Sequence, residues 1–181
     1  MRKITLICAS LFVGVSLSNA QVVTFAGSPS SGILNGTGTT ALFHNPTGIT
    51  ADKSGNLYVA DQVNNVIRKI VISTGQVTTL AGTGSMGQVN GAGTAASFNQ
   101  PVGVAADTNG NLYVADAGNN VIRKIVIASA TVSTLPGNGG QGSGNGLGSS
   151  ATFFRPTGVA LDKSGNLYVA DYGNNMIRKI V

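Results

Sequence analysis

The acidic residues of this chain are six aspartates in two series, each with a spacing of 55 residues. Asp61, Asp116 and Asp171 each stand in an Ala-Asp-x-x-Asn-Asn segment. A ring of such carboxylates, assisted by the neighbouring asparagine oxygens, could bind a cation such as Ca²⁺. Alternatively, each carboxylate accepts backbone N–H bonds in its turn or pairs with the arginine seven residues further on. Because the group recurs in every unit, we expect the structural role and no cofactor, with Ca²⁺ at these three residues as the alternative.

Other catalytic residue types are scarce. The chain has one histidine, His44, no glutamate, one cysteine, Cys8, and no Gly-x-Ser-x-Gly segment. A metal-dependent lyase needs several histidine or carboxylate ligands around its ion. Such a site cannot be assembled from these residues alone, so we expect no catalytic residue here. An enzyme is expected only if further repeats supply the active site.

The spacing of the aspartates belongs to a longer repeat. Residues 98–126 read FNQPVGVAADTNGNLYVADAGNNVIRKIV, and residues 43–71 and 153–181 read nearly the same. A fixed period of this size indicates a repeat architecture, in which each unit buries its apolar faces against its neighbours.

Four short strands are predicted in each unit, near residues 103–106, 111–115, 121–127 and 132–135 of the middle one. Leu112 and Val114 would face one way and Tyr113 and Ala115 the other, so both faces are apolar. Helical turns are expected only at 39–43, 94–98 and 149–153, because β-branched residues, Gly and Asn disfavour helix elsewhere. Four antiparallel strands with two apolar faces favour an all-β fold, a β-propeller with three blades, over a stacked β-solenoid.

The run Pro-x-Gly-Val/Ile-x-x-Asp-x-x-Gly-Asn-Leu-Tyr-Val-Ala-Asp-x-x-Asn-Asn-x-Ile-Arg-Lys-Ile resembles the NHL repeat, the blade unit of a family of β-propellers. The resemblance implies a propeller that usually has six blades. Three repeats therefore leave three alternatives: a piece of a longer protein, a head-to-tail homodimer that completes six blades, or an open arc. The pairs 68–69, 123–124 and 178–179, each Arg-Lys, are expected towards the rim, on a solvated face and in ion pairs.

The first twenty residues predict a secretory signal peptide. Arg2 and Lys3 precede an apolar run, residues 4–17, and Ser18-Asn19-Ala20 supplies small residues for cleavage. Removal of Arg2 and Lys3 lowers the formal net charge from +5 to +3. We therefore expect a secreted or periplasmic chain, with no membrane contact after processing and no nucleic-acid partner. The predicted domains are the signal, 1–20, and the propeller region, 21–181, with units at about 22–71, 77–126 and 132–181.

The positions at which the units differ predict a ligand-binding face. The differing residues cluster just before the repeated prolines and in the turn after the second strand, two places expected on the same face of a blade. The best candidates for contact with a ligand are Phe154, Arg155, Tyr172, His44 and Gln62. Neutral drift in loops is the alternative. We expect a secreted binding or scaffolding module for a protein or small ligand, or else a fragment of an extracellular lyase or lactone hydrolase.

Overall fold

The structure, a computed structural model, describes residues 20–135 and 137–181. The predicted signal peptide therefore lies outside the described residues, except for Ala20. Within the described ranges, no helix is long and apolar enough to span a membrane.

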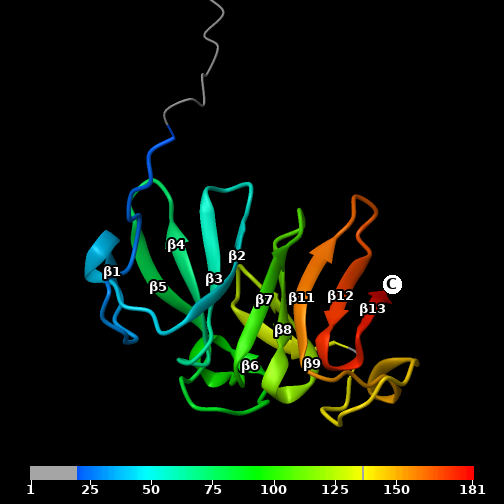
Figure 1. The fold of residues 1–181 in the computed structure, drawn as a ribbon. Helices are drawn as coiled ribbons and strands as arrows, with labels where there is room; N and C mark the ends of the chain where they lie inside the picture. The colour runs from blue at the N-terminus through cyan, green and yellow to red at the C-terminus, as the bar shows by residue number, and fades with distance from the viewer. Residues whose placement is uncertain (1–19, 136) are drawn as a thin grey trace, which may run out of the picture.

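Three antiparallel sheets stand side by side in a row (Figure 1), and each takes its first three strands from one predicted unit. The fourth strand of the first two sheets comes from the start of the next unit. The first blade contains β2 (Pro46–Ala51), β3 (Asn56–Asp61), β4 (Val66–Val71) and β5 (Gln76–Ala81). The second contains β7 (Pro101–Ala106), β8 (Asn111–Asp116), β9 (Val121–Val126) and β10 (Thr131–Thr134). The third contains β11 (Pro156–Leu161), β12 (Leu167–Asp171) and β13 (Met176–Ile180). The all-β propeller prediction is confirmed, and the three blades form part of a propeller.

Strand boundaries follow from the local sequence. Pro101 begins β7, since a residue without an N–H is tolerated at the start of a strand. Asp107 directly follows β7, and its Oδ1 accepts hydrogen bonds from the backbone N–H groups of Asn109 and Asn111, both at 2.8 Å. Gly110 completes the turn with φ +81°, a conformation that costs glycine little.

Three details differ from the sequence-based expectation. The Gly-rich connections contribute a short fifth strand at the outer edge of the first two sheets, β1 (Gly36–Thr37) on β5 and β6 (Gly91–Ala92) on β10. The expected helical turns are 3-10 turns that lie slightly earlier, at Gly38–Thr40, Gly93–Ala95 and Gly148–Ser150. The expectation that helical turns occur only there is wrong, because Ala117–Asn119 and Tyr172–Asn174 also form 3-10 turns after the second strand of their blades. Residues 22–26, which repeat the sequence of β5, form no strand.

The core lies between the blades, as the two apolar strand faces predict. Leu112 and Val114 pack with Tyr58 and Ala60 of the first blade, and Ala115 packs with residues of the third. The alternation of side chains along β8 therefore serves two interfaces at once.

The first strands of successive blades lie closest together. Gly48 of β2 approaches β7 so closely that a methyl group there would collide with the carbonyl oxygen of Val102, and Gly103 has the same relation to Thr157. The Thr47 hydroxyl also donates to the carbonyl of Val102 at 3.0 Å. Glycine at this position thus allows backbone-to-backbone contact between blades.

Candidate functional site

Each blade contains a buried aspartate–arginine pair, and the middle blade shows its geometry. The N–H of Asn99 donates to Oδ1 of Asp116 at 2.8 Å. Asn119 Nδ2 and Arg123 Nη1 donate to Oδ2 at 2.8 and 3.0 Å. The Arg123 guanidinium lies over the ring of Phe98, 5.1 Å from its centre. The carboxylate thus joins the entry to the first strand, the turn after the second strand and the third strand.

The same arrangement recurs with little change in the other blades. Arg68 Nη1 lies 3.0 Å from Asp61 Oδ2, and Arg178 Nη1 lies 2.9 Å from Asp171 Oδ2. Pairing with the arginine seven residues further on, one of the two expected structural roles, is therefore present in every blade. The backbone N–H that each aspartate accepts comes from 17 residues upstream instead of from its own turn.

The prediction that the arginines lie on a solvated rim is wrong. Arg68 and Arg123 are fully buried, and Arg178 is only 9% exposed. Their Nη2 atoms donate to a carbonyl and to an asparagine side chain in the Gly-rich connection, which for Arg123 are Val89 and Asn90. Only the adjacent lysines face outward to varying degrees. The connections therefore cover the arginines, which the strand sequence alone does not reveal.

These contacts leave the carboxylates poorly suited to a cation. Burial raises the pKa of the Asp116 carboxyl, against the opposing effects of the N–H of Asn99, the Asn119 amide and Arg123. Within residues 20–135 and 137–181, no group of three or more His, Cys, Asp or Glu side chains could hold a metal ion. Ca²⁺ at the three aspartates remains an untested alternative, and it would have to displace an arginine.

The second aspartate series stabilises the turn between the first two strands. Asp52 Oδ2 accepts bonds from Asn56 Nδ2 and the Tyr58 hydroxyl, both at 2.8 Å. Burial acts to raise the pKa of the Asp52 carboxyl, but its bonds from Asn56, Tyr58 and the N–H of Ser54 together hold that pKa below its ordinary value. Asp107 and Asp162 make the corresponding bonds. The carboxylates of this series therefore have a structural role in their turns.

The predicted face residues occupy equivalent edges of the first and third blades. In the third blade, the N–H of Gly173 donates to the carbonyl of Phe154 at 2.7 Å, which places Tyr172 beside the segment of Phe154 and Arg155. Tyr172 is 65% exposed, Arg155 is exposed, and Phe154 is half-buried.

In the first blade, the N–H of Val63 donates to the carbonyl of His44 at 3.2 Å, and the N–H of Gln62 donates to that of Asn45 at 3.4 Å. His44 and Gln62, both half-buried, therefore lie on adjoining segments. The structure brings the five residues together as two groups, one in each outer blade, with the middle blade between them.

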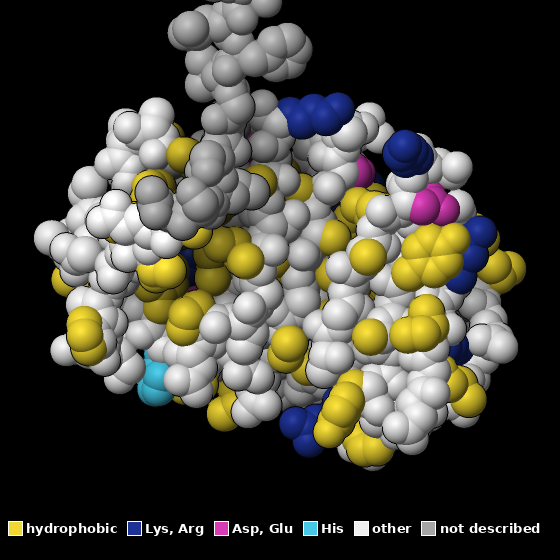
Figure 2. Space-filling model, turned by 45° about the horizontal axis from the view of Figure 1, so that its top comes forward, with side chains coloured by type: hydrophobic (Ala, Val, Ile, Leu, Met, Phe, Trp, Pro, Cys, Tyr) yellow, Lys and Arg dark blue, Asp and Glu magenta, His cyan; other side chains and the backbone are white. Residues whose placement is uncertain are grey.

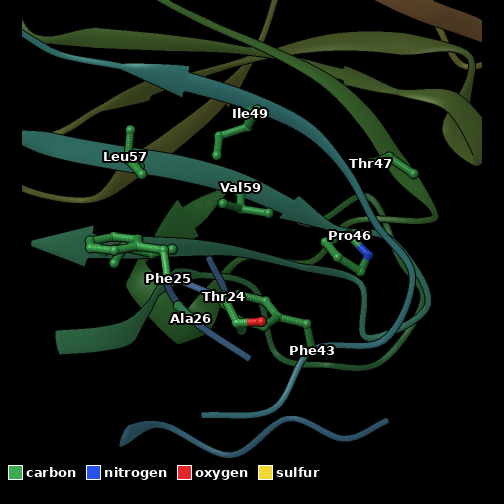
Figure 3. Close-up of a pocket in the computed structure, with 10 residues that line it drawn as sticks. Thr24, Phe25, Ala26, Phe43, Pro46, Thr47, Ile49, Leu57 and Val59 are labelled. Atoms are coloured by element: carbon green, nitrogen blue, oxygen red, sulfur yellow. The ribbon is translucent and has the colours of Figure 1, made fainter. Parts of the chain in front are cut away.

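Hydrophobic side chains are also exposed at the two ends of the row of blades, on the left and right of Figure 2. Exposed large hydrophobic residues of the outer blades include Ile49 of β2 and Ile177 of β13, and Phe25 is exposed in the N-terminal segment (Figure 3). The sequence pattern alone did not single them out. The sequence nevertheless contains a signal for this exposed surface, because each of these residues has a hydrophobic counterpart in another unit that the repeat pattern predicts to be buried.

A model of the NHL repeat matches residues 43–69, 98–125 and 153–180. The chain is 32% identical over 166 residues to Protein SUPPRESSOR OF QUENCHING 1, chloroplastic, of Arabidopsis thaliana, an alignment that covers 86% of this chain and 16% of that protein. It is 33% identical over 89 residues to the probable peptidyl-alpha-hydroxyglycine alpha-amidating lyase pgal-1 of Caenorhabditis elegans, covering 45% of this chain and 23% of that one. The chain thus spans less than a quarter of the length of either relative.

The fold is also similar to solved structures. An auxiliary nutrient binding protein from Bacteroides ovatus superposes with a TM-score of 0.68 at 23% identity, over 80% of this chain and 39% of that one. The three matched segments each begin at the phenylalanine that stacks on the buried arginine and extend into the third strand of a blade. The chain therefore belongs to the NHL-repeat β-propeller family.

Proposed function

We propose that this chain is a secreted NHL β-propeller module that binds a protein or small ligand on the face formed by Phe154, Arg155 and Tyr172, with His44 and Gln62 extending it. The observation that supports this proposal is the contrast between a repeated scaffold and unrepeated residues at its edge. The buried pair, the turn aspartates and the inter-blade glycines recur, whereas these edge residues differ from blade to blade.

The chemistry of the third blade suits recognition. A largely exposed tyrosine, a phenylalanine and an arginine on adjoining segments combine flat apolar surface with a positive charge. Tyrosine and arginine are the side chains that most often dominate binding energy at interfaces. Aromatic side chains also provide contact area with little loss of conformational entropy.

The repeat supplies a matched variant for the test. Phe154→Asn, Arg155→Gln and Tyr172→Ala together convert this edge into that of the second blade, which already folds with Asn99, Gln100 and Ala117. The wild type and the triple variant, both of residues 21–181 and fluorescently labelled, are applied to arrays of glycans and of peptides. We expect binding by the wild type and its loss in the variant, with unchanged circular dichroism. Equal binding by the two proteins, or no binding by the wild type, would refute the proposed face.

Secretion is supported by the basic start, the apolar run and the small residues that end at Ala20. Expression of residues 1–181 in a bacterial host should give a periplasmic product that begins at Gln21. An uncleaved cytoplasmic product would contradict this part of the proposal.

A lyase is the second candidate function, because the C. elegans relative carries that activity in its printed name. The three blades contain one histidine and no glutamate, so the active residues of such an enzyme would have to lie in blades other than these three. Residues 21–181 should therefore not cleave a peptidyl-α-hydroxyglycine substrate with or without added Zn²⁺. Measurable turnover that the triple variant retains would favour the enzyme over the binding module.

A further inference from the structure

Asparagine followed by glycine occurs five times in the chain, at Asn35, Asn90, Asn109, Asn138 and Asn145. Asparagine is among the thermolabile residues of proteins. Its side-chain amide is lost most readily before glycine, because glycine has no Cβ to shield its backbone nitrogen. The structure holds these five asparagines in different ways, and the differences indicate which of them reacts.

The asparagines of the Gly-rich connections are held by the buried arginines. In the second blade, Asn90 Oδ1 accepts a bond from Arg123 Nη2 at 2.9 Å and one from Thr134 Oγ1 at 3.1 Å. The following residue, Gly91, lies in β6 and pairs with Val132. Both the amide and the next backbone nitrogen are therefore fixed in place. The same arginine bond is present at the counterparts, Asn35 and Asn145.

Asn109 has no such restraint. Asn138 Oδ1 still accepts the N–H of Gly140 at 2.8 Å, whereas the Asn109 side chain is exposed and makes no hydrogen bond within residues 20–135 and 137–181. The following residue, Gly110, has φ +81°, and a Cβ there would meet nothing within 4 Å. Asn109 is thus the member of the five whose amide is free to rotate towards the next nitrogen.

The repeat shows that this turn does not need an amide. Ser54 and Ser164 occupy the place of Asn109 in the other blades, and both are followed by glycine. Their N–H groups donate to Asp52 Oδ1 and Asp162 Oδ1 at 2.8 and 2.9 Å, as the N–H of Asn109 does to Asp107. The turn lies at the opposite end of the second strand from the proposed ligand face, so its chemistry is independent of the proposed function.

We propose that Asn109 is the site at which the folded protein deamidates, with water as the second reactant. The nitrogen of Gly110 attacks Cγ of Asn109 and forms a cyclic imide. Its proton passes through solvent to the departing amide nitrogen, and the bond from Cγ to that nitrogen breaks to release ammonia. Water then adds to one of the two imide carbonyl carbons, and the bond from that carbon to the ring nitrogen breaks. One water thus replaces one ammonia, and nothing is oxidised or reduced.

The point of ring opening decides the product. Opening at Cγ gives aspartate, whereas opening at the main-chain carbonyl carbon gives isoaspartate, in which the backbone runs through the side chain. Asp107 Oδ1 accepts the N–H of Asn111 at 2.8 Å, and its Oδ2 accepts Asn111 Nδ2 at 2.7 Å. An extra backbone carbon between residues 109 and 110 displaces Asn111 from Asp107 and weakens these bonds. Isoaspartate should therefore loosen the hairpin turn.

Either product also changes the charge of the turn. The new carboxylate lies two residues from Asp107, and it lowers the formal net charge of residues 21–181 from +3 to +2. Lys53 and Asn109 line the same hollow of about 250 Å³ between the turns of the first two blades. The modified molecule should therefore be separable from the original by cation exchange.

The first test locates the reaction. Residues 21–181 are incubated in warm, mildly alkaline buffer made with heavy-oxygen water, and peptide mapping by mass spectrometry follows each asparagine. We expect aspartate and isoaspartate carrying one heavy oxygen at residue 109, formed at least about tenfold faster than at Asn90, because Asn90 must first lose a bond to a charged group. In urea this difference should largely disappear. Equal rates at the two residues in the folded protein, or the same ratio in urea, would overturn the proposal.

The second test uses the turn of the other blades as the control. Asn109→Ser copies Ser54 and Ser164, so the variant should fold as the wild type does. During the same incubation the wild type should develop an acidic peak on cation exchange, and the isolated peak should unfold at a lower urea concentration. The variant should develop no peak at that rate. A peak of equal size in the variant would place the reaction at another residue and refute the proposal, and an acidic peak with unchanged stability would refute the effect on the turn.

Discussion

Removal of the buried carboxylate should cost more stability in the second blade than in the third. Asp116→Ala leaves Arg123 charged and fully buried, with no acidic partner. Breaking a buried pair from one side typically costs about 3–5 kcal/mol. In the third blade, Arg178 lines a hollow of about 310 Å³ beside residues 145–148, so water can reach its guanidinium after Asp171→Ala. We therefore expect a loss at Asp171 that is smaller by about 1–2 kcal/mol.

Urea denaturation of residues 21–181, followed by circular dichroism, measures both losses. The reasoning fails if the two losses are equal, or if Asp116→Ala costs less than about 1 kcal/mol, the value expected for an exposed pair.

Three other predictions follow from the turns and the aspartates. Burial acts to raise the pKa of the Asp107 carboxyl, but its hydrogen bonds hold that pKa below the ordinary value, so its contribution to stability is present above the ordinary carboxyl pKa and is lost as the pH falls through the lowered one. Asp107→Asn should therefore lose less of its unfolding free energy than the wild type between about pH 5 and pH 2. An identical loss in the two proteins would contradict this. Gly82 has φ +113°, and a Cβ there would lie 2.7 Å from the carbonyl oxygen of Asn65, whereas a Cβ on Gly110 would face open space. Gly82→Ala should therefore lower the free energy of unfolding by at least about 2 kcal/mol, and Gly110→Ala by about 1 kcal/mol, in urea denaturation. The reverse order would refute this. Because the buried carboxylates are occupied by arginine and asparagine donors, millimolar Ca²⁺ should leave the melting temperature unchanged, and a rise would instead support a cation site.

The sequence predicted the fold well because the repeat supplies its own comparison. Pro101, the Asp107 turn and the two-faced run at Leu112–Ala115 recur in the other units with the same residue types. Local signals of this kind determine where a strand begins, how the chain reverses and which faces are buried. Strand positions and the two inter-blade faces were therefore predictable.

The burial of Arg123 was not predictable from the strand that carries it. Its polar partners Val89, Asn90 and Ser97 lie 26–34 residues upstream in the Gly-rich connection, whose path the strand pattern does not specify. A weak signal existed, since Asn35, Asn90 and Asn145 recur at the same spacing as the arginines. The short fifth strand was missed for the same reason, because its pairing depends on the path of that connection.

The buried pair also explains how a rigid scaffold can present a variable face. Asp61, Asp116 and Asp171 each accept the backbone N–H of the residue two before the proline, and that residue is His44, Asn99 or Phe154. A bond to the backbone fixes the position of the segment without restricting the identity of its side chain. Selection can therefore change the side chain at this edge without disturbing the blade, provided that the aspartate and its arginine remain. The residues that repeat and the residues that differ are thus parts of one arrangement, in which the first group positions the second.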